Sequence, residues 1–297
     1  MQNIETLSFI SLVVKIKDRV SFMPIPLKYW LLVAFVLPAQ LGIAQMNLSG
    51  KSGLMYTPNA TEYKDGSLSF GYNYNPIKYA LRGKRENPER ILYANLTLVP
   101  RLTITLNLTQ AISKGKQVRE GLGDRQIDIS YLILKEKPKV PSLAIIMSSP
   151  FMIETVMLTN VLVATKHFDL KSNFSLEANL GYGSPYVISR KGGFDLNLNN
   201  SNIFSNLQLK KKSEFQYNNG YLVGPFAGVK LSYHNKAGLM TEWDSQHLNV
   251  GAYVTLWKKW TIQGGLINGD QFMFGSSFHL QLLKPKKSID KLDEKNY

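Results

Sequence analysis

Apolar and polar residues alternate along most of the chain, from about residue 67 to residue 283. Residues 102–109 read Leu-Thr-Ile-Thr-Leu-Asn-Leu-Thr, and segments 172–182, 247–257 and 271–282 repeat this pattern. A period of two is typical of a β-strand whose two faces meet different surroundings. No stretch of a dozen residues in this region has a convincing helical period. The pattern therefore predicts an all-β protein.

About twelve strands are predicted, and many have the 9–11 residues with which a tilted strand crosses a bilayer. They are 67–75, 91–99, 101–110, 125–135, 141–149, 155–166, 172–182, 220–232, 238–243, 247–257, 259–266 and 270–283.

The lengths of the connections indicate how these strands are arranged. Three long connections, 76–90, 111–124 and 183–219, all follow odd-numbered strands, whereas short turns such as 167–171 follow even-numbered ones. In an up-and-down antiparallel sheet the three long connections then emerge at one end. Short turns at one end and long loops at the other are typical of outer-membrane barrels.

An exported β-sandwich is the alternative, because its strands also alternate. Two features favour the barrel. The polar face is rich in Thr, Asn, Ser, Gly and Gln, as a confined lumen would be, and aromatic residues gather near strand ends, as at Tyr72 and Tyr74 or Trp257 and Trp260. Such clusters are typical of the membrane interface. We predict that 67–283 form a transmembrane up-and-down antiparallel β-barrel in the outer membrane.

The N-terminal residues 1–44 are interpreted as a leader. Lys28 precedes a 16-residue apolar run, 29–44, that ends in small residues, which is the order of a secretory signal peptide and is too short for a spanning helix. Met23 is interpreted as the true start, and an N-terminal membrane anchor is the alternative. We expect 45–66 to be a lead-in segment and the mixed-charge residues 284–297 to be a disordered periplasmic tail.

Composition then excludes several kinds of chemistry. The 297 residues include no Cys, so there is no disulfide, no thiolate metal site, no thiol nucleophile and no lipidated N-terminal Cys. The formal net charge is +14, and removing 1–44 takes away four basic and two acidic residues, which leaves +12. This charge favours anionic partners. Export argues against nucleic acid and leaves lipopolysaccharide, outer-membrane lipids or an acidic glycan.

Two segments resemble the YjbH-type outer-membrane barrel family. Residues 53–60 read Gly-Leu-Met-Tyr-Thr-Pro-Asn-Ala and precede Asp-Gly and an aromatic-rich strand, which is similar to the opening of that family. Residues 225–228, 242–245 (Glu-Trp-Asp-Ser) and 249–251 resemble its closing block, continued by Gly-rich segments at 264–265 and 273–275.

The resemblance implies a role in exopolysaccharide production and export, in a compact single-barrel version of a family with longer members. We expect a non-enzymatic barrel for cell-surface polysaccharide export or envelope assembly. Envelope proteins of the outer membrane or periplasm are expected partners. The alternatives are a structural subunit of a larger outer-membrane complex, a small porin-like channel and, least favoured, a barrel hydrolase.

Candidate catalytic and metal-binding residues are few. Ser277 and His279 share a strand face, as in barrel phospholipases, but their surroundings lack the Ser-Asn-Gly context of those enzymes and no orienting partner is evident. His167 and His234 are expected in solvated turns, and with His247 the histidines have no spacing typical of zinc. We therefore predict no catalytic, cofactor or metal site.

Four acids form a predicted polar site in the lumen or at its rim: Glu242, Asp244, Asp128 and Glu177. One interpretation is a site for cations or sugar hydroxyls. The favoured alternative is a structural role, in which Glu242 and Asp244 accept hydrogen bonds inside the barrel and brace it.

Basic residues concentrate in two of the long loops. If these loops are external, they meet lipopolysaccharide or an anionic polymer, although simple solvation is an equal alternative. The predicted contacts are Arg82, Lys84, Arg85, Arg190, Lys191, Lys210, Lys211 and Lys212.

Overall fold

The computed structural model describes residues 45–81, 87–112, 123–150, 156–190, 207–215 and 220–283, which all belong to one compact unit, 41–297. The predicted leader, 1–44, and the predicted tail, 284–297, lie outside the described residues. Within the described part of the chain no helix is long and apolar enough to cross a bilayer, a finding that concerns helices only.

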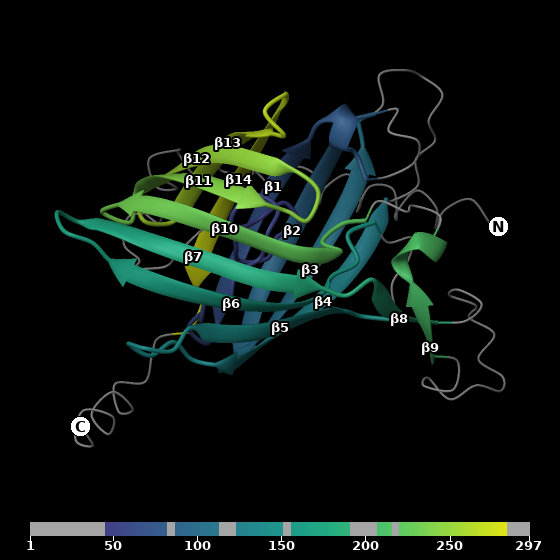
Figure 1. Ribbon diagram of the computed structural model, residues 1–297, viewed down its shortest axis with the longest axis horizontal. Coiled ribbons are helices and arrows are strands. Elements are labelled where there is room, and N and C mark those ends of the chain that lie inside the picture. The colour runs from purple at the N-terminus through teal and green to yellow at the C-terminus, as the bar shows by residue number, and fades with distance from the viewer. Residues whose placement is uncertain are drawn as a thin grey trace, which may run out of the picture. The chain divides into compact units, whose positions relative to one another are not determined.

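Twelve strands of the described residues close into an antiparallel barrel (Figure 1). Neighbours in sequence pair along the wall, β7 pairs with β10, and β1 closes the ring against β14. The strands are β1 (Ser67–Asn75), β2 (Glu89–Val99), β3 (Leu102–Ala111), β4 (Asp124–Leu134), β5 (Ser142–Ser148), β6 (Asn160–Asp169), β7 (Phe174–Gly183), β10 (Gly224–Tyr233), β11 (Ala237–Trp243), β12 (Leu248–Leu256), β13 (Trp260–Ile267) and β14 (Gln271–Gln281).

The predicted strand number, order and asymmetry are confirmed. Three connections at one end, 170–173, 234–236 and 257–259, each contain two consecutive residues with positive φ: Ser172-Asn173, His234-Asn235 and Trp257-Lys258. Two such residues in a row make the tight hairpins that match the twist of antiparallel strands. We call this the turn end, and the opposite end, which carries the connections 76–88, 112–123 and 184–223, the long-loop end.

Both ends of strand β6 differ from the prediction. Strand β6 begins at Asn160 instead of residue 155, so the β5–β6 connection, 149–159, is a fourth long one. His167 lies inside β6 and not in a turn, because the alternation continues through Lys166 and Phe168 to the left-handed turn at Ser172.

A small sheet inside the longest connection was also missed. Strands β8 (Tyr186–Arg190) and β9 (Leu207–Lys211) pair as an antiparallel hairpin, followed by the short 3₁₀ helix η2 (Lys212–Glu214). A second 3₁₀ turn, η1 (Ile77–Tyr79), follows β1.

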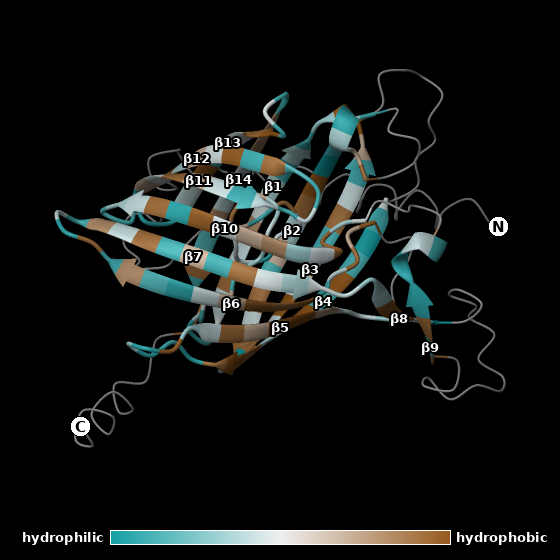
Figure 2. Ribbon diagram, in the orientation of Figure 1, coloured by the Kyte–Doolittle hydropathy of each residue, from teal (hydrophilic) through white to brown (hydrophobic). Residues whose placement is uncertain are grey.

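The outer face of the wall is apolar. Along β4 the exposed side chains Ile127, Ile129, Tyr131 and Ile133 alternate with buried Gln126 and Asp128, and Figure 2 shows the same alternation of brown and teal along other strands. Exposed apolar side chains on every second residue are what a lipid-facing wall presents.

Aromatic pairs lie on this face near both ends, as predicted. Tyr74 stacks on Phe274 toward the long-loop end, with ring centroids 5.3 Å apart. Trp257 and Trp260 stack at the turn end, at 5.8 Å. Aromatic belts at two levels suit the two interfaces of a bilayer.

The predicted lead-in segment lies inside the barrel. Residues 45–60 are all buried, and we call them the plug; in Figure 1 they are the purple segment within the ring of strands. The plug is folded on itself, since Leu48 N donates to Met55 O, Leu54 N to Thr57 O and Asn59 N to Ser52 O. Residues 61–66 then lead to β1 at the turn end.

Candidate functional site

Glu242 of β11 binds the backbone of the plug. Its carboxylate accepts hydrogen bonds from the amides of Met55, Tyr56 and Thr57 at 3.2, 2.7 and 3.1 Å, and from the Thr57 hydroxyl at 2.7 Å. Glu242 is an inward residue because β11 alternates and Trp243 faces outward. One wall carboxylate therefore satisfies three plug amides that could not reach water, each of which would be costly to bury unpaired.

Asp244 lies next to this contact but holds the wall. Asp244 Oδ1 accepts from the amides of Gln246 and His247, at 2.9 and 2.8 Å, and so shapes the β11–β12 turn. Asn249 donates to both acids, 3.1 Å from Glu242 Oε1 and 3.0 Å from Asp244 Oδ2. The structure thus brings the predicted pair together in a bracing arrangement.

Asp128 of β4 forms an ion pair with Lys51 of the plug. The Lys51 Nζ to Asp128 Oδ2 distance is 2.6 Å, and both side chains are essentially buried. Asp128 is held in place by Ser148 Oγ, at 2.6 Å, and by Gln126 Nε2. Lys51 also donates to Ser49 Oγ at 2.8 Å. A buried pair of this kind fixes the plug against one side of the wall.

Glu177 of β7 is the centre of a third cluster. It is paired with Lys230 of β10, lies 3.4 Å from His167 Nε2 on β6, and accepts a hydrogen bond from Asn59 Nδ2 of the plug at 2.8 Å. His167 Nδ1 lies 2.6 Å from Glu136 Oε2. His167 therefore joins Glu177 to Glu136 from within β6; the predicted turn position is wrong, although its side chain is 37% exposed.

Glycines of the wall leave room for plug side chains. Gly251 of β12 and Gly265 of β13 are paired in register, and a Cβ at either would overlap the Met55 sulfur. A Cβ at Gly228 of β10 would likewise overlap Leu54. These positions need Gly because another chain segment packs directly against the strand backbone.

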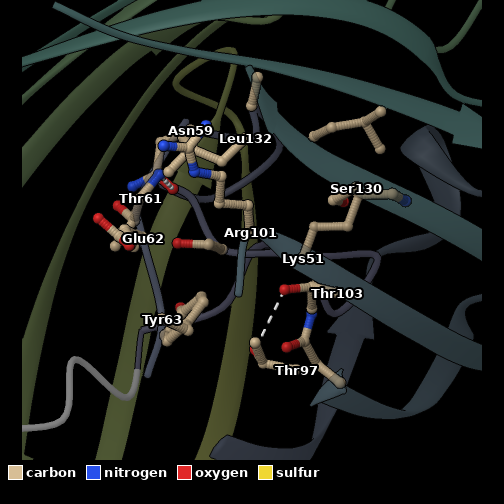
Figure 3. A pocket seen from close by; sticks show the side chains of 14 residues that line it. Lys51, Asn59, Thr61, Glu62, Tyr63, Thr97, Arg101, Thr103, Ser130 and Leu132 are labelled. Atoms are coloured by element: carbon tan, nitrogen blue, oxygen red, sulfur yellow. Dashed lines mark hydrogen bonds between the residues drawn. The ribbon is translucent and has the colours of Figure 1, made fainter. Parts of the chain in front are cut away.

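The turn-end pocket lies on the turn-end side of the plug, and Figure 3 shows the side chains that line it. It has a volume of about 30 Å³, room for about two water molecules. Its walls combine hydroxyls and amides with two cations, and in Figure 3 Thr97 and Thr103 are joined by a hydrogen bond. The lining residues are Lys51, Ser52, Asn59, Thr61, Glu62, Tyr63, Asn95, Thr97, Arg101, Thr103, Ser130, Leu132, Ala144 and Ile146.

The long-loop pocket lies above the plug and is also about 30 Å³. Four aromatic rings surround it, and His247 meets Tyr79 edge-on with centroids 4.9 Å apart. Tyr221 hydrogen-bonds through its hydroxyl to Tyr56 O at 3.2 Å and so covers the plug from this side. The lining residues are Tyr56, Tyr79, Leu81, Tyr221, Leu222, Asp244, Gln246 and His247.

Of the eight predicted basic contacts, four lie outside the described residues, three belong to the β8–β9 hairpin, and Lys212 follows the hairpin in η2. Arg82, Lys84, Arg85 and Lys191 lie outside the described residues. Arg190 ends β8, and Lys210 and Lys211 end β9, so these three belong to the hairpin.

Lys212 differs from the expected surface position. Its side chain is buried and donates to Tyr221 O at 3.0 Å. Burial lowers the pKa of Lys212 to about 7; the Lys51 charge also lowers it, and Asp128 opposes both. The buried amine thus connects the segment after the hairpin to Tyr221, whose hydroxyl contacts the plug at Tyr56 O.

Ser277 and His279, the pair not predicted to be catalytic, both lie on β14. His279 Nδ1 lies 2.9 Å from Ser69 Oγ, across the β1–β14 pairing, and its ring stacks on Tyr63. Among the described residues no hydrogen-bonded carboxylate orients this imidazole, which a catalytic triad would need. The described residues also contain no cluster of His, Cys, Asp and Glu that could hold a metal ion.

The chain matches the family described as exopolysaccharide biosynthesis protein YbjH (YjbH) over residues 45–296, and it therefore belongs to this family. The matched range begins at the first residue of the plug. No curated protein matches the chain.

Two solved barrels resemble the fold distantly. The KdgM porin is 8% identical, over 73% of this chain and 99% of that one, with a TM-score of 0.37. Wzi, described as an outer membrane protein involved in group 1 capsule assembly in Escherichia coli and as a carbohydrate-binding β-barrel, is 11% identical over 66% of this chain, with a TM-score of 0.25. The match covers only 52% of Wzi, and neither similarity carries an argument about function.

Proposed function

We propose that this protein is a non-enzymatic outer-membrane barrel that acts in the export of an exopolysaccharide to the cell surface. Its family, which is one of exopolysaccharide biosynthesis, supports the substrate class. The observation that carries the proposal is the polar lumen inside an apolar, aromatic-belted wall, since that combination suits a protein that brings a hydrated polymer through a bilayer.

The filled lumen favours a pore that opens only when the polymer is exported over one that is permanently open. Residues 45–60 occupy it, and the pockets above and below them each hold only about two waters. A sugar ring is several times larger than that. In this state the barrel is closed, so export requires the plug to shift or leave.

The test is deletion of the gene in the native host, followed by separate measurement of polysaccharide outside the cells and within the envelope. Export predicts less polymer outside and more retained inside, with recovery when the wild-type chain is supplied. Unchanged amounts in both fractions would contradict the proposal. Loss of polymer from both fractions would indicate a role in synthesis instead of export.

A structural subunit of a larger envelope assembly is the second candidate, and the closed lumen favours it. A platform needs no passage, and the β8–β9 hairpin presents exposed side chains such as Leu209, 70% exposed, at the long-loop end. Purification in mild detergent at native abundance distinguishes the two: stable co-purification of envelope proteins supports the subunit, whereas a monomer supports export by the barrel itself.

A further inference from the structure

We propose that the turn-end and long-loop pockets are the two halves of one carbohydrate passage, closed by the Lys51–Asp128 ion pair. Its turn-end half lies between the plug and strands that include β4, and its long-loop half lies between the plug, Tyr221 and the β11–β12 turn. This inference rests on the proposed function, because it assumes that the polymer is a glycan, and it adds the route and the residues that close it.

A continuous chain of contacts joins the two pockets. Lys51 lines the turn-end pocket and donates to Ser49 Oγ at 2.8 Å. Ser49 Oγ in turn accepts from the hydroxyl of Tyr221, at 3.4 Å, and Tyr221 lines the long-loop pocket. The side chains of Lys51, Ser49 and Tyr221 therefore form a hydrogen-bonded path from one pocket to the other.

The wall beside this route is polar and regular. Asp128 and Ser130 are successive inward positions of β4, the first in the ion pair and the second in the turn-end pocket. Above them, Gln126 donates to Asp128 at 2.8 Å. Strand β4 thus presents three successive inward polar side chains, Gln126, Asp128 and Ser130, before the apolar Leu132, and such a row suits a hydroxyl-rich chain.

Apart from the ion pair, the polar contacts between the 49–52 turn of the plug and its surroundings are long hydrogen bonds. The 53–60 part of the plug is fixed by the four contacts to Glu242, and Asn73 Nδ2 fixes residues 47 and 48 by two bonds of 2.9 Å. The 49–52 turn contacts its surroundings through the ion pair, through hydrogen bonds of 3.4 Å from Asn107 to Ser49 O and from Tyr221 to Ser49 Oγ, and through packing of Gly50 against Tyr93 of β2. A shift of this short turn would join the pockets while the rest of the plug stays bound.

The two pockets offer what a sugar ring binds. Tyr56, Tyr79 and Tyr221 supply aromatic faces for the apolar C–H side of the ring at the long-loop end. At the turn end, Thr61 Oγ1 is buried without a hydrogen-bond partner among the described residues, so it is available to a ligand hydroxyl. Aromatic faces with a few placed polar groups are typical of small-molecule sites.

The test is single-channel conductance of the purified full chain in planar bilayers, with liposome swelling in raffinose as the sugar probe. The wild type should be silent. Asp128→Asn removes the charge that holds Lys51 and should produce conductance steps and raise the swelling rate by about tenfold or more, because losing a buried ionic partner strongly disfavours the closed state. The charge swap Lys51→Asp with Asp128→Lys should restore closure.

The matched control is Lys230→Gln, which removes the buried cationic partner of Glu177 but leaves the Glu177–Asn59 hydrogen bond to the plug; neither Lys230 nor Glu177 lines a pocket. This variant should stay silent. A folded Asp128→Asn barrel that remains closed would overturn the proposal, and so would equal conductance from the control. Ser148→Ala is a milder variant in case Asp128→Asn does not fold, since it removes one hydrogen bond to Asp128, and it should raise swelling by a smaller factor.

A second measurement uses the absence of Cys in the chain. A cysteine at Thr61, in the turn-end pocket, should react with a membrane-impermeant thiol reagent, whereas one at Ser49 should react only when Asp128→Asn or Ser148→Ala is also present. Reaction of the Ser49 cysteine in an otherwise wild-type chain would show that no closure exists there. If the passage fails these tests but gene deletion still blocks export, only the route is wrong; unchanged export on deletion refutes the proposed function whatever the conductance.

Discussion

Lys51 Nζ lies 2.6 Å from Asp128 Oδ2 in the interior of the barrel, where the two side chains are only 1% and 0% exposed. One partner belongs to the N-terminal plug and the other to strand β4. A segment that precedes the first strand is thereby joined to the wall by charge as well as by packing. The pair makes the plug part of the folded barrel and not an appendage.

Replacing Lys51 with Met should lower the free energy of unfolding by about 3 kcal/mol or more, because Asp128 would remain buried without its partner. Urea titration of the refolded barrel in detergent measures the change. Lys135→Met is the matched control: Lys135 pairs with Glu62 at 2.7 Å, but both side chains are well exposed. Its effect should stay below about 1 kcal/mol. Equal effects of the two variants would contradict a buried, structural role for Lys51.

The close packing of Gly251 against Met55 predicts that a substitution at one of these residues compensates for a substitution at the other. Gly251→Ala should destabilise the barrel, because its Cβ would overlap the Met55 sulfur. Met55→Ala in the same chain should recover part of the loss, since it vacates that space. A thermodynamic cycle of the two single variants and the double variant measures the coupling, expected at about 1 kcal/mol or more. Strictly additive effects would show that Met55 does not pack there.

The outward face of β12 tests whether the wall faces lipid. Ala252, in the middle of that strand, is exposed. Ala252→Arg should cost about 2–4 kcal/mol of folding free energy in a bilayer, as a charge near its midplane does. Ala252→Leu at the same site should be nearly neutral. If the Arg variant folds into vesicles as stably as the Leu variant, this face does not meet lipid.

Lys212 predicts a dependence of stability on pH. Burial lowers its folded-state pKa to about 7, below the usual value of 10.5, so between these values the unfolded chain binds more protons than the folded one. Stability should therefore rise as the pH increases from about 7 toward 10.5. Lys212→Met should flatten this rise in urea titrations across that range. An identical pH profile in the variant would contradict the buried position of the amine.

The barrel was predictable because its strands follow one simple rule. Alternation such as Leu102-Thr103-Ile104-Thr105 specifies which face meets lipid, and the length of each segment specifies a crossing. The ends of strands are harder to predict where the alternation continues past a plausible turn, as at His167. Short strands such as β8 and β9 have too few residues to show a period.

The plug could not be predicted in the same way. Residues 45–60 have neither a helical nor a strand period, because their backbone is satisfied by wall side chains such as Glu242 and Asn73 that lie far away in the sequence. The four predicted acids proved to lie inside the barrel, and three of them, Glu242, Asp128 and Glu177, contact the plug. The sequence could indicate that these acids are buried. It could not indicate that they contact the plug, because the two come together only when the barrel closes around it.

The most direct test of the account compares the conductance of the wild-type barrel with that of a chain lacking residues 45–60, both refolded and inserted in planar bilayers. We predict a silent wild type and large, stable conductance steps from the shortened chain, since the deletion empties a lumen lined by polar side chains. Conductance of the same size from both proteins, or a folded shortened chain that stays silent, would contradict the conclusion that this segment closes the barrel.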